Sequence, residues 1–127
     1  MAEMTLQRIP FTVENDNRMR SLKAKTGVTP NLLGRFGFCI SLEEPGIPKK
    51  INLDDEMGRE INRYTMLGEY DEMFIALLKT WMINHDIDHN DSENMNNYFV
   101  DHMNRGFENI FSRMKTIADL ERLIPKK

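Results

Sequence analysis

Apolar residues recur at spacings of three and four over two long stretches of the chain, and this period predicts two amphipathic helices. The stretches cover residues 70–82 and 95–114. Residues 84–97, which join the two and include the start of the second, are polar and acidic. The polar residues predict a loop, with the second helix beginning at a capping residue near Ser92. Gly106 interrupts the second stretch, where it would let a neighbouring backbone approach closely.

Two more helices are predicted in the N-terminal half. Residues 13–25 favour a helix, and Gly27 follows at the position where glycine commonly ends one. Thr29 can cap a new helix and Pro30 suits its first position, so a second helix is predicted over residues 30–43. The apolar residues of this helix cover more than one face. We therefore expect it to be central and buried on most sides.

The remaining segments are short. They are an extended arm or edge strand over residues 6–12, a loop over 45–53, a short helix over 54–63, an irregular link over 64–68, and a last helix over 116–124. Together these elements predict a mainly α fold: a single domain, residues 1–127, built as a small helical bundle of about four to six helices with a short N-terminal arm or strand.

Composition supports a small globular protein and excludes several classes. The chain has 127 residues, of which 40% are hydrophobic and 29% charged. No apolar run approaches the roughly 18 residues that span a bilayer, and the N-terminus lacks the pattern of a secretory signal, so we expect a cytoplasmic protein without a membrane partner. Its one cysteine, Cys39, excludes a disulfide framework and a multi-cysteine zinc site.

Charge is distributed unevenly along the chain. The net charge is −3, but residues 54–101 are strongly acidic and the segments on either side are basic. Between residues 18 and 35 there are five cations and no acid, and two lysines follow in the predicted loop. The seven are Arg18, Arg20, Lys23, Lys25, Arg35, Lys49 and Lys50. Because salt screens charges beyond about 10 Å, such a group can bind a phosphate backbone even in an acidic protein. The alternative is a solvated helix face.

Motifs for catalysis are weak. His85 and His89 have the spacing of two metal ligands on one helix face, but the glutamate that a zincin needs after the first histidine is absent. Cys39 lies between apolar residues, so we expect it to be buried and unreactive. No glycine-rich phosphate loop or local serine triad is present. The sequence therefore predicts no catalytic residue, no metal site and no cofactor.

Four stretches of sequence resemble the DndE family of DNA sulfur-modification (phosphorothioation) proteins. They are residues 22–31, 41–48, 62–71 and 102–106. The resemblance implies a small helical, DNA-binding accessory subunit of a system that replaces a non-bridging phosphate oxygen of DNA with sulfur. It also implies other phosphorothioation proteins as partners, a homo-tetramer, and a lysine-lined surface suited to nicked duplex. On this sequence the family's basic positions beside the Thr-Gly turn correspond to Arg20, Lys23 and Lys25.

The predicted function is therefore phosphate-backbone binding to double-stranded DNA, nicked duplex included, without an enzymatic role. One alternative is a metal-dependent nickase, because nicking is attributed to some family members; its ligands would be Asp54, Asp55 and Glu56, or the two histidines. Another is a ribbon-helix-helix regulator, since residues 13–43 form a two-helix unit behind an extended arm. The acidic loop 84–97 and the final lysines correspond to no family role.

Overall fold

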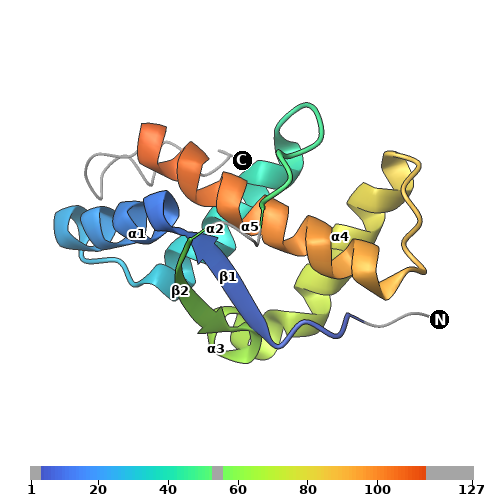
Figure 1. Ribbon diagram of the computed structural model, residues 1–127, viewed down its shortest axis with the longest axis horizontal. Helices are drawn as coiled ribbons and strands as arrows, with labels where there is room; N and C mark the ends of the chain where they lie inside the picture. The colour runs from blue at the N-terminus through green and yellow to red at the C-terminus, as the bar shows by residue number, and fades with distance from the viewer. Residues whose placement is uncertain (1–3, 53–55, 114–127) are drawn as a thin grey trace, which may run out of the picture.

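The computed structural model describes residues 4–52 and 56–113 and is mainly helical, with one two-stranded antiparallel sheet (Figure 1). In chain order the elements are β1 (Arg8–Thr12), α1 (Val13–Thr26), α2 (Pro30–Glu43), β2 (Met57–Asn62), α3 (Arg63–Leu67), the 3-10 turn η1 (Gly68–Tyr70), α4 (Asp71–Asn84) and α5 (Ser92–Arg113). The predicted mainly α class is confirmed. The predicted N-terminal arm or strand is the strand β1, but the helical bundle is not the whole fold, because β1 pairs with a second strand, β2, that was not predicted.

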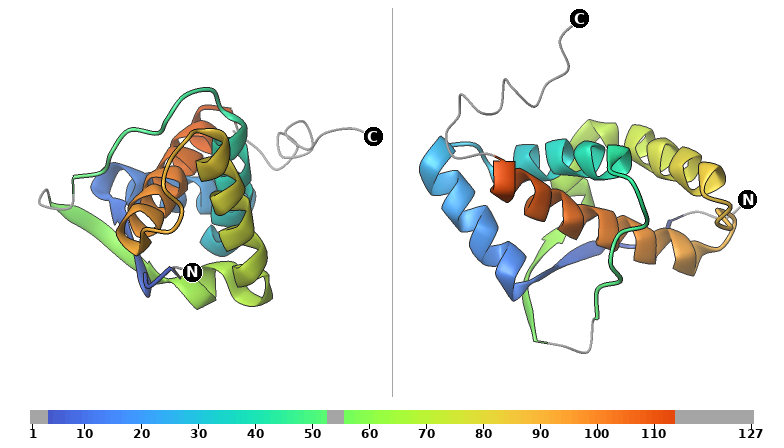
Figure 2. Two further views of the ribbon diagram at one scale, coloured as in Figure 1. Left: turned by 90° about the vertical axis from the view of Figure 1, so that its right-hand side faces the viewer. Right: turned by 90° about the horizontal axis from the view of Figure 1, so that it is seen from above.

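The long helix α5 runs through the middle of the protein. Figure 2 shows α2 and α4 along one side of it, with α1 and the sheet on the other. Aromatic rings join these layers: Phe38 of α2 lies 5.0 Å from Phe99 of α5, and Phe11 of β1 lies 5.4 Å from Phe107 of α5. All four rings are fully buried. The core is therefore organised around α5.

The helices α2 and α5 approach each other at two glycines. A Cβ atom on Gly106 would lie 2.4 Å from the carbonyl carbon of Gly37, closer than Cβ atoms in proteins lie to other atoms. Only residues without a side chain permit this approach. The expectation that Gly106 admits a neighbouring backbone is therefore confirmed, and Gly37 is the partner that sequence reasoning did not identify.

Residues 57–62 form a strand where the sequence predicted a helix over 54–63. The pairing is antiparallel, with Ile9 opposite Ile61. A Cβ on Gly58 would lie 2.7 Å from the Cβ of Asp16 in α1, so a glycine is needed where the strand crosses that helix. Tertiary pairing with β1 thus overrides the local preference. The expected link over 64–68 is instead mostly the short helix α3 followed by η1.

Two asparagines of α5 bind the backbone of β1 and of the residues just before it. Asn96 Oδ1 accepts the N–H groups of residues 5 and 6, each at 3.1 Å. Asn104 accepts the N–H of Thr12 at 3.1 Å and donates to the carbonyl of Pro10 at 3.1 Å. Strand β2 pairs with one edge of β1, and Asn104 occupies part of the other edge, the one that a ribbon-helix-helix dimer would need.

Helix ends follow the sequence closely. Helix α1 ends with Gly27 in the left-handed conformation (φ 75°), and its N–H bonds to the carbonyl of Lys23 at 2.8 Å. Helix α2 begins at Pro30 as predicted, but the Thr29 side chain makes no capping hydrogen bond. Helix α5 begins at Ser92, also as predicted. The predicted helix over 116–124 lies outside the described residues.

Two predicted buried faces are partly exposed. On α2, Leu32 is 55% exposed and Cys39 is exposed, because the face toward α5 is taken by the glycines and Phe38. On α4, Met73 and Leu77 are 51% and 38% exposed. The apolar stripes are therefore wider than the core that they contact. No helix within the described ranges is long and apolar enough to cross a membrane.

Candidate nucleic-acid interface

The seven cations that the sequence singles out lie on different elements, and the structure does not bring them into one cluster. Four belong to α1, one to α2, and two to the segment between α2 and β2. They are Arg18, Arg20, Lys23, Lys25, Arg35, Lys49 and Lys50. All except Arg18 and Arg35 are exposed. Their local contacts decide which of them can meet a ligand.

Arg35 is engaged within the protein. Its Nε donates to the carbonyl of Met66 at 2.7 Å, and its guanidinium lies over the ring of Tyr70, 5.6 Å from the centroid. Gly68 makes room for it, since a Cβ there would lie 3.0 Å from Nη2. These contacts tie α2 to α3 and η1. Arg35 therefore has a clear structural role.

Arg20 shares a carboxylate with a cation that sequence reasoning missed. Asp16, buried on α1, lies 3.4 Å from Nε of Arg20 and 3.0 Å from Nε of Arg59. It also accepts the backbone N–H of Arg59 at 3.2 Å. This contact brings Arg59 of β2 to the surface of α1. The strand that does so was predicted as a helix, so the pairing could not be foreseen.

Arg18 and Lys25 lie on the side of α1 that faces α5. Both cations are near the ring of Phe111: the Arg18 guanidinium is 5.9 Å and the Lys25 ammonium 5.5 Å from its centroid. Arg18 also lies 3.9 Å from a carboxylate oxygen of Glu108. Sequence reasoning assigned Phe111 to the apolar stripe, yet its exposed fraction is 37%.

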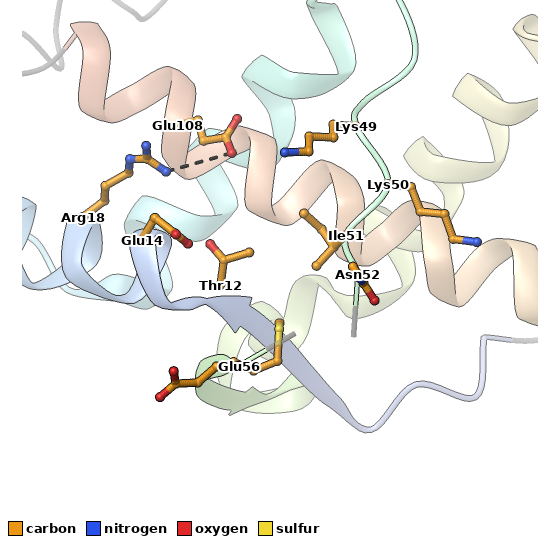
Figure 3. Close-up of a pocket in the computed structure, with 10 residues that line it drawn as sticks. Thr12, Glu14, Arg18, Lys49, Lys50, Ile51, Asn52, Glu56 and Glu108 are labelled. Carbon is orange, nitrogen blue, oxygen red and sulfur yellow. Dashed lines mark ion pairs between the residues drawn. The ribbon is translucent and has the colours of Figure 1, made fainter. Parts of the chain in front are cut away.

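A cleft of about 400 Å³ lies between α1, α5 and the segment that carries the two lysines (Figure 3). Its lining includes three cations and three acids: Arg18, Lys49, Lys50, Glu14, Glu56 and Glu108. Figure 3 shows Lys49 pointing toward Glu108, whereas Lys50 points away along α5. The cleft brings together the lysine pair and one arginine of α1, residues about 30 positions apart in the sequence.

Residues 44–52, here called the lysine loop, are held on α5 by Arg105. Its Nη1 donates to the carbonyl of Gly46 at 3.1 Å. Its Nη2 and Nε bind the carbonyl and hydroxyl oxygens of Ser41, at 2.5 and 2.8 Å. The fork of one guanidinium therefore joins the end of α2 to the start of the loop. Burial lowers the pKa of Arg105, although nearby glutamates oppose this.

Asp101 holds the far end of the lysine loop. Its Oδ1 accepts the N–H of Ile51 at 3.0 Å. Burial raises the pKa of Asp101 to about 6, although the Ile51 N–H and the nearby Lys50 ammonium both act to lower it. The loop is thus fixed before and after its lysines, and one of its anchors titrates just below neutral pH.

The raised pKa of Asp101 predicts an unusual effect of Asp101→Asn on stability. A carboxylate whose folded pKa lies above the unfolded value destabilises the folded state at neutral pH, and this cost disappears as the pH falls through 6 toward 4. An asparagine cannot ionise and its oxygen can still accept the Ile51 N–H. We expect Asp101→Asn to raise the free energy of unfolding by about 1 to 2 kcal/mol at pH 7 and to leave it nearly unchanged near pH 3.5, below the unfolded pKa.

Urea unfolding of both proteins at several pH values measures this difference. Glu93→Gln, an exposed acid on the same helix, is the control and should show no such trend. A destabilised Asp101→Asn protein at pH 7 would contradict the interpretation, because it would mean that the charged form makes a net favourable contact.

A buried serine and histidine lie next to Arg105. The Ser41 hydroxyl accepts from Nε of Arg105 and shares a hydrogen bond of 2.8 Å with Nδ1 of His102. Burial, Arg105 and His85 lower the pKa of His102 to about 3, so the ring is neutral. Both side chains are fully buried. A serine and histidine without solvent access cannot attack an external substrate, and this pair therefore has a structural role.

Metal-binding chemistry has no support in the described part of the chain, where no three acidic, histidine or cysteine side chains are grouped to hold an ion. His85 stacks on Trp81 at 4.3 Å and its Nδ1 donates to the carbonyl of that residue at 2.8 Å. Of the three carboxylates proposed for a nickase, Glu56 lines the cleft. The other two, Asp54 and Asp55, lie outside the described residues.

Cys39 is exposed, and the prediction that it is buried is wrong. It lies on the face of α2 that points away from α5. Partial desolvation and the Glu43 carboxylate raise the pKa of its thiol. The thiolate is the reactive form of cysteine, so this environment makes Cys39 a poor nucleophile.

Comparisons with known proteins identify a family. The family model of DNA sulphur modification protein DndE matches residues 8–118. The crystal structure of DndE from Escherichia coli B7A, described as involved in DNA phosphorothioation modification, is similar in fold, with a TM-score of 0.62 and 19% sequence identity. The likeness covers 85% of this chain and 99% of that one. No curated protein sequence gives a significant match.

Proposed function

The chain therefore belongs to the DndE family of DNA sulphur modification proteins, and we propose that it serves such a system by binding the phosphate backbone of duplex DNA, nicked duplex included. The lysine loop is the observation that carries this proposal. Lys49 and Lys50 are exposed, and neither forms an ion pair with another described residue. Two unpaired ammonium groups on an anchored loop are well placed to neutralise adjacent phosphates.

Anchoring matters because an anchored loop loses less conformational freedom when its lysines bind than a mobile loop does. Here Arg105 and Asp101 of α5 hold the loop on both sides of the lysines. They act as positioning residues for Lys49 and Lys50. The contacts expected are with phosphates rather than base edges, so binding should depend strongly on salt and little on sequence.

Helix α1 extends the proposed surface. Lys23 is exposed and forms no ion pair with another described residue, whereas Arg20 is held by Asp16 beside Arg59. These cations would add further phosphate contacts outside the cleft. The proposal does not require Arg35, whose contacts are internal.

The proposal includes a homo-oligomer, a tetramer as the family resemblance implies, together with other phosphorothioation proteins as partners and a cytoplasmic location. Several weak phosphate contacts per chain would be multiplied by avidity when subunits share one DNA molecule. Exposed apolar side chains on neighbouring helices, such as Leu32 and Met73, are the kind of residue that a subunit contact covers.

Removing the two lysines tests the proposal. We expect Lys49→Ala/Lys50→Ala to bind a random-sequence duplex at least roughly tenfold more weakly near 0.1 M salt, and to lower the slope of log K against log salt by about two units, because two phosphate contacts are lost. Fluorescence anisotropy with labelled intact and nicked duplexes at three salt concentrations measures both quantities. Circular dichroism should show unchanged folding, since both side chains are exposed.

The matched control is Lys79→Ala on α4, which removes one positive charge away from the cleft. Its salt slope should equal that of the unaltered protein. The single variants Lys49→Ala and Lys50→Ala give the effect of removing one charge from the loop. If Lys79→Ala weakens binding as much as either of them, net charge rather than a lysine-loop contact explains the affinity, and the proposed surface is wrong.

Neither alternative function gains support from a particular contact. A nickase would need a metal site, and the carboxylates that line the cleft are interleaved with cations. A ribbon-helix-helix regulator would pair β1 with a second subunit, but β2 takes one edge of this strand and Asn104 part of the other. Backbone binding is therefore the function that the geometry favours.

A further inference from the structure

Phe111 is a partly exposed aromatic ring next to two cations of α1. The preceding apolar residues of α5, Phe107 and Ile110, are fully buried, whereas Phe111 lies beyond the edge of the core with 37% of its surface exposed. Arg18 and Lys25 of α1 lie 5.9 and 5.5 Å from its centroid. The ring therefore has a solvent-accessible part, with positive charge beside it.

Aromatic rings interleaved with cations are the usual surface for unpaired nucleic acid. A base stacks on the ring while the cations neutralise the neighbouring phosphates. A duplex offers no base for such stacking, because each base already stacks on its neighbours. The charge beside Phe111 favours a polyanion over an apolar protein partner, which would gain nothing from desolvating two cations.

Arg18 connects this ring to the cleft. Its guanidinium lies over Phe111, and the same side chain lines the cleft together with Lys49. Figure 3 shows Arg18 and Lys49 on opposite sides of Glu108, which lies 3.9 Å from Arg18. Arg18 thus contacts both the ring and the cleft, so a DNA strand that binds Arg18 lies next to both.

We propose that Phe111 is a stacking platform for one unpaired nucleobase of DNA, with Arg18 and Lys25 binding the phosphates beside that base. This inference rests on the proposed function and deepens it, since stacking on Phe111 would give the protein a preference for interrupted over intact duplex. At a gap or a frayed nick a base is free to leave the stack and reach the ring. In intact duplex the ring makes no such contact.

The test compares two DNA molecules of equal length, an intact duplex and a duplex with one unpaired 2-aminopurine at a gap. Phe111→Leu keeps apolar bulk but removes the ring, and Phe111→Tyr keeps the ring. We expect Phe111→Leu to bind the gapped DNA roughly tenfold more weakly and the intact duplex equally well, because stacking of a base on an aromatic ring is lost. Phe111→Tyr should bind both as the unaltered protein does.

The fluorescence of 2-aminopurine reports the stacking directly. It should be quenched when the unaltered protein or Phe111→Tyr binds, and remain unquenched with Phe111→Leu. Ile83→Ala, which truncates an exposed apolar residue near the end of α4, should leave both affinities and the quenching unchanged.

The outcomes separate this inference from the proposed function. If the unaltered protein binds the intact duplex with the expected salt dependence but Phe111→Leu binds and quenches gapped DNA normally, the platform is wrong and backbone binding stands. If Phe111→Leu weakens binding to both DNA molecules equally, the ring has only a structural role, and the platform is again wrong. If the unaltered protein binds neither DNA, both proposals fail.

Discussion

Replacing Gly106 with alanine should lower the free energy of unfolding by about 3 kcal/mol, a large part of the 5 to 15 kcal/mol typical of a small protein. The added Cβ would lie 2.4 Å from the carbonyl carbon of Gly37, 2.6 Å from its oxygen and 2.9 Å from the nitrogen of Phe38. All three atoms belong to the backbone of α2, which cannot move aside alone. The helices must separate, and the gain of about 1 kcal/mol in helix propensity is too small to offset this.

Gly34→Ala is the matched control for this effect. It adds the same methyl group to α2, but the atoms that it would meet belong to the flexible end of the Met66 side chain, the nearest being Sδ at 2.4 Å. We expect its stability to lie within about 1 kcal/mol of the unaltered protein. Urea unfolding followed by circular dichroism measures both variants. Equal stability of the two variants would show that α2 and α5 can separate without cost, contrary to the packing described above.

Local chemistry predicted the helix boundaries well. Gly27, Pro30 and Ser92 each act through the conformation of their own turn, so their positions could be assigned from neighbouring residues alone. The close approach at Gly106 was likewise foreseen from a single glycine in an apolar stripe. Its partner Gly37 was not, because the contact joins residues far apart in the chain.

The strand β2 could not be predicted from its own residues. Its pairing depends on β1, about 50 residues earlier, and its glycine is required by Asp16 of a different element. Short segments such as this one take their structure from their neighbours more than from propensity. The error had a consequence for the candidate site, because it hid the contact between Arg59 and α1.

The candidate site itself was only partly predictable. A run of cations without acids identified the basic residues, but not that Arg35 contacts Met66 inside the protein. The anchors of the lysine loop were missed because Asp101 and Arg105 form part of a helix pattern that gives no sign of their partners. Phe111 was missed for a different reason: the periodic stripe that predicts a buried face continues beyond the core.

Replacing Arg63 with methionine should have an effect at least as large as that of Gly106→Ala, about 3 to 5 kcal/mol. Arg63 is 5% exposed, and its guanidinium binds both oxygens of Asp71, at 3.0 and 3.4 Å. It also donates to the carbonyls of Met4 and Leu6, at 3.0 and 2.7 Å. Methionine matches its apolar stem but leaves a poorly solvated carboxylate and two carbonyls without donors, and such unpaired groups are costly.

The loss should be concentrated at the N-terminal segment, because Arg63 is what joins residues 4–7 to the start of α4. Urea unfolding gives the global effect, and hydrogen exchange should show faster exchange of the residue 5 and 6 amides, which Asn96 holds in the unaltered protein. The stability of Arg63→Lys should lie between those of the unaltered protein and Arg63→Met, since an ammonium cannot reproduce the five donors of a guanidinium.

Arg8→Met is the control: its ion pair with Glu60 is exposed, so its loss should cost less than about 1 kcal/mol. Equal costs for Arg63→Met and Arg8→Met would contradict the assignment of Arg63 as the residue that fixes this end of the protein.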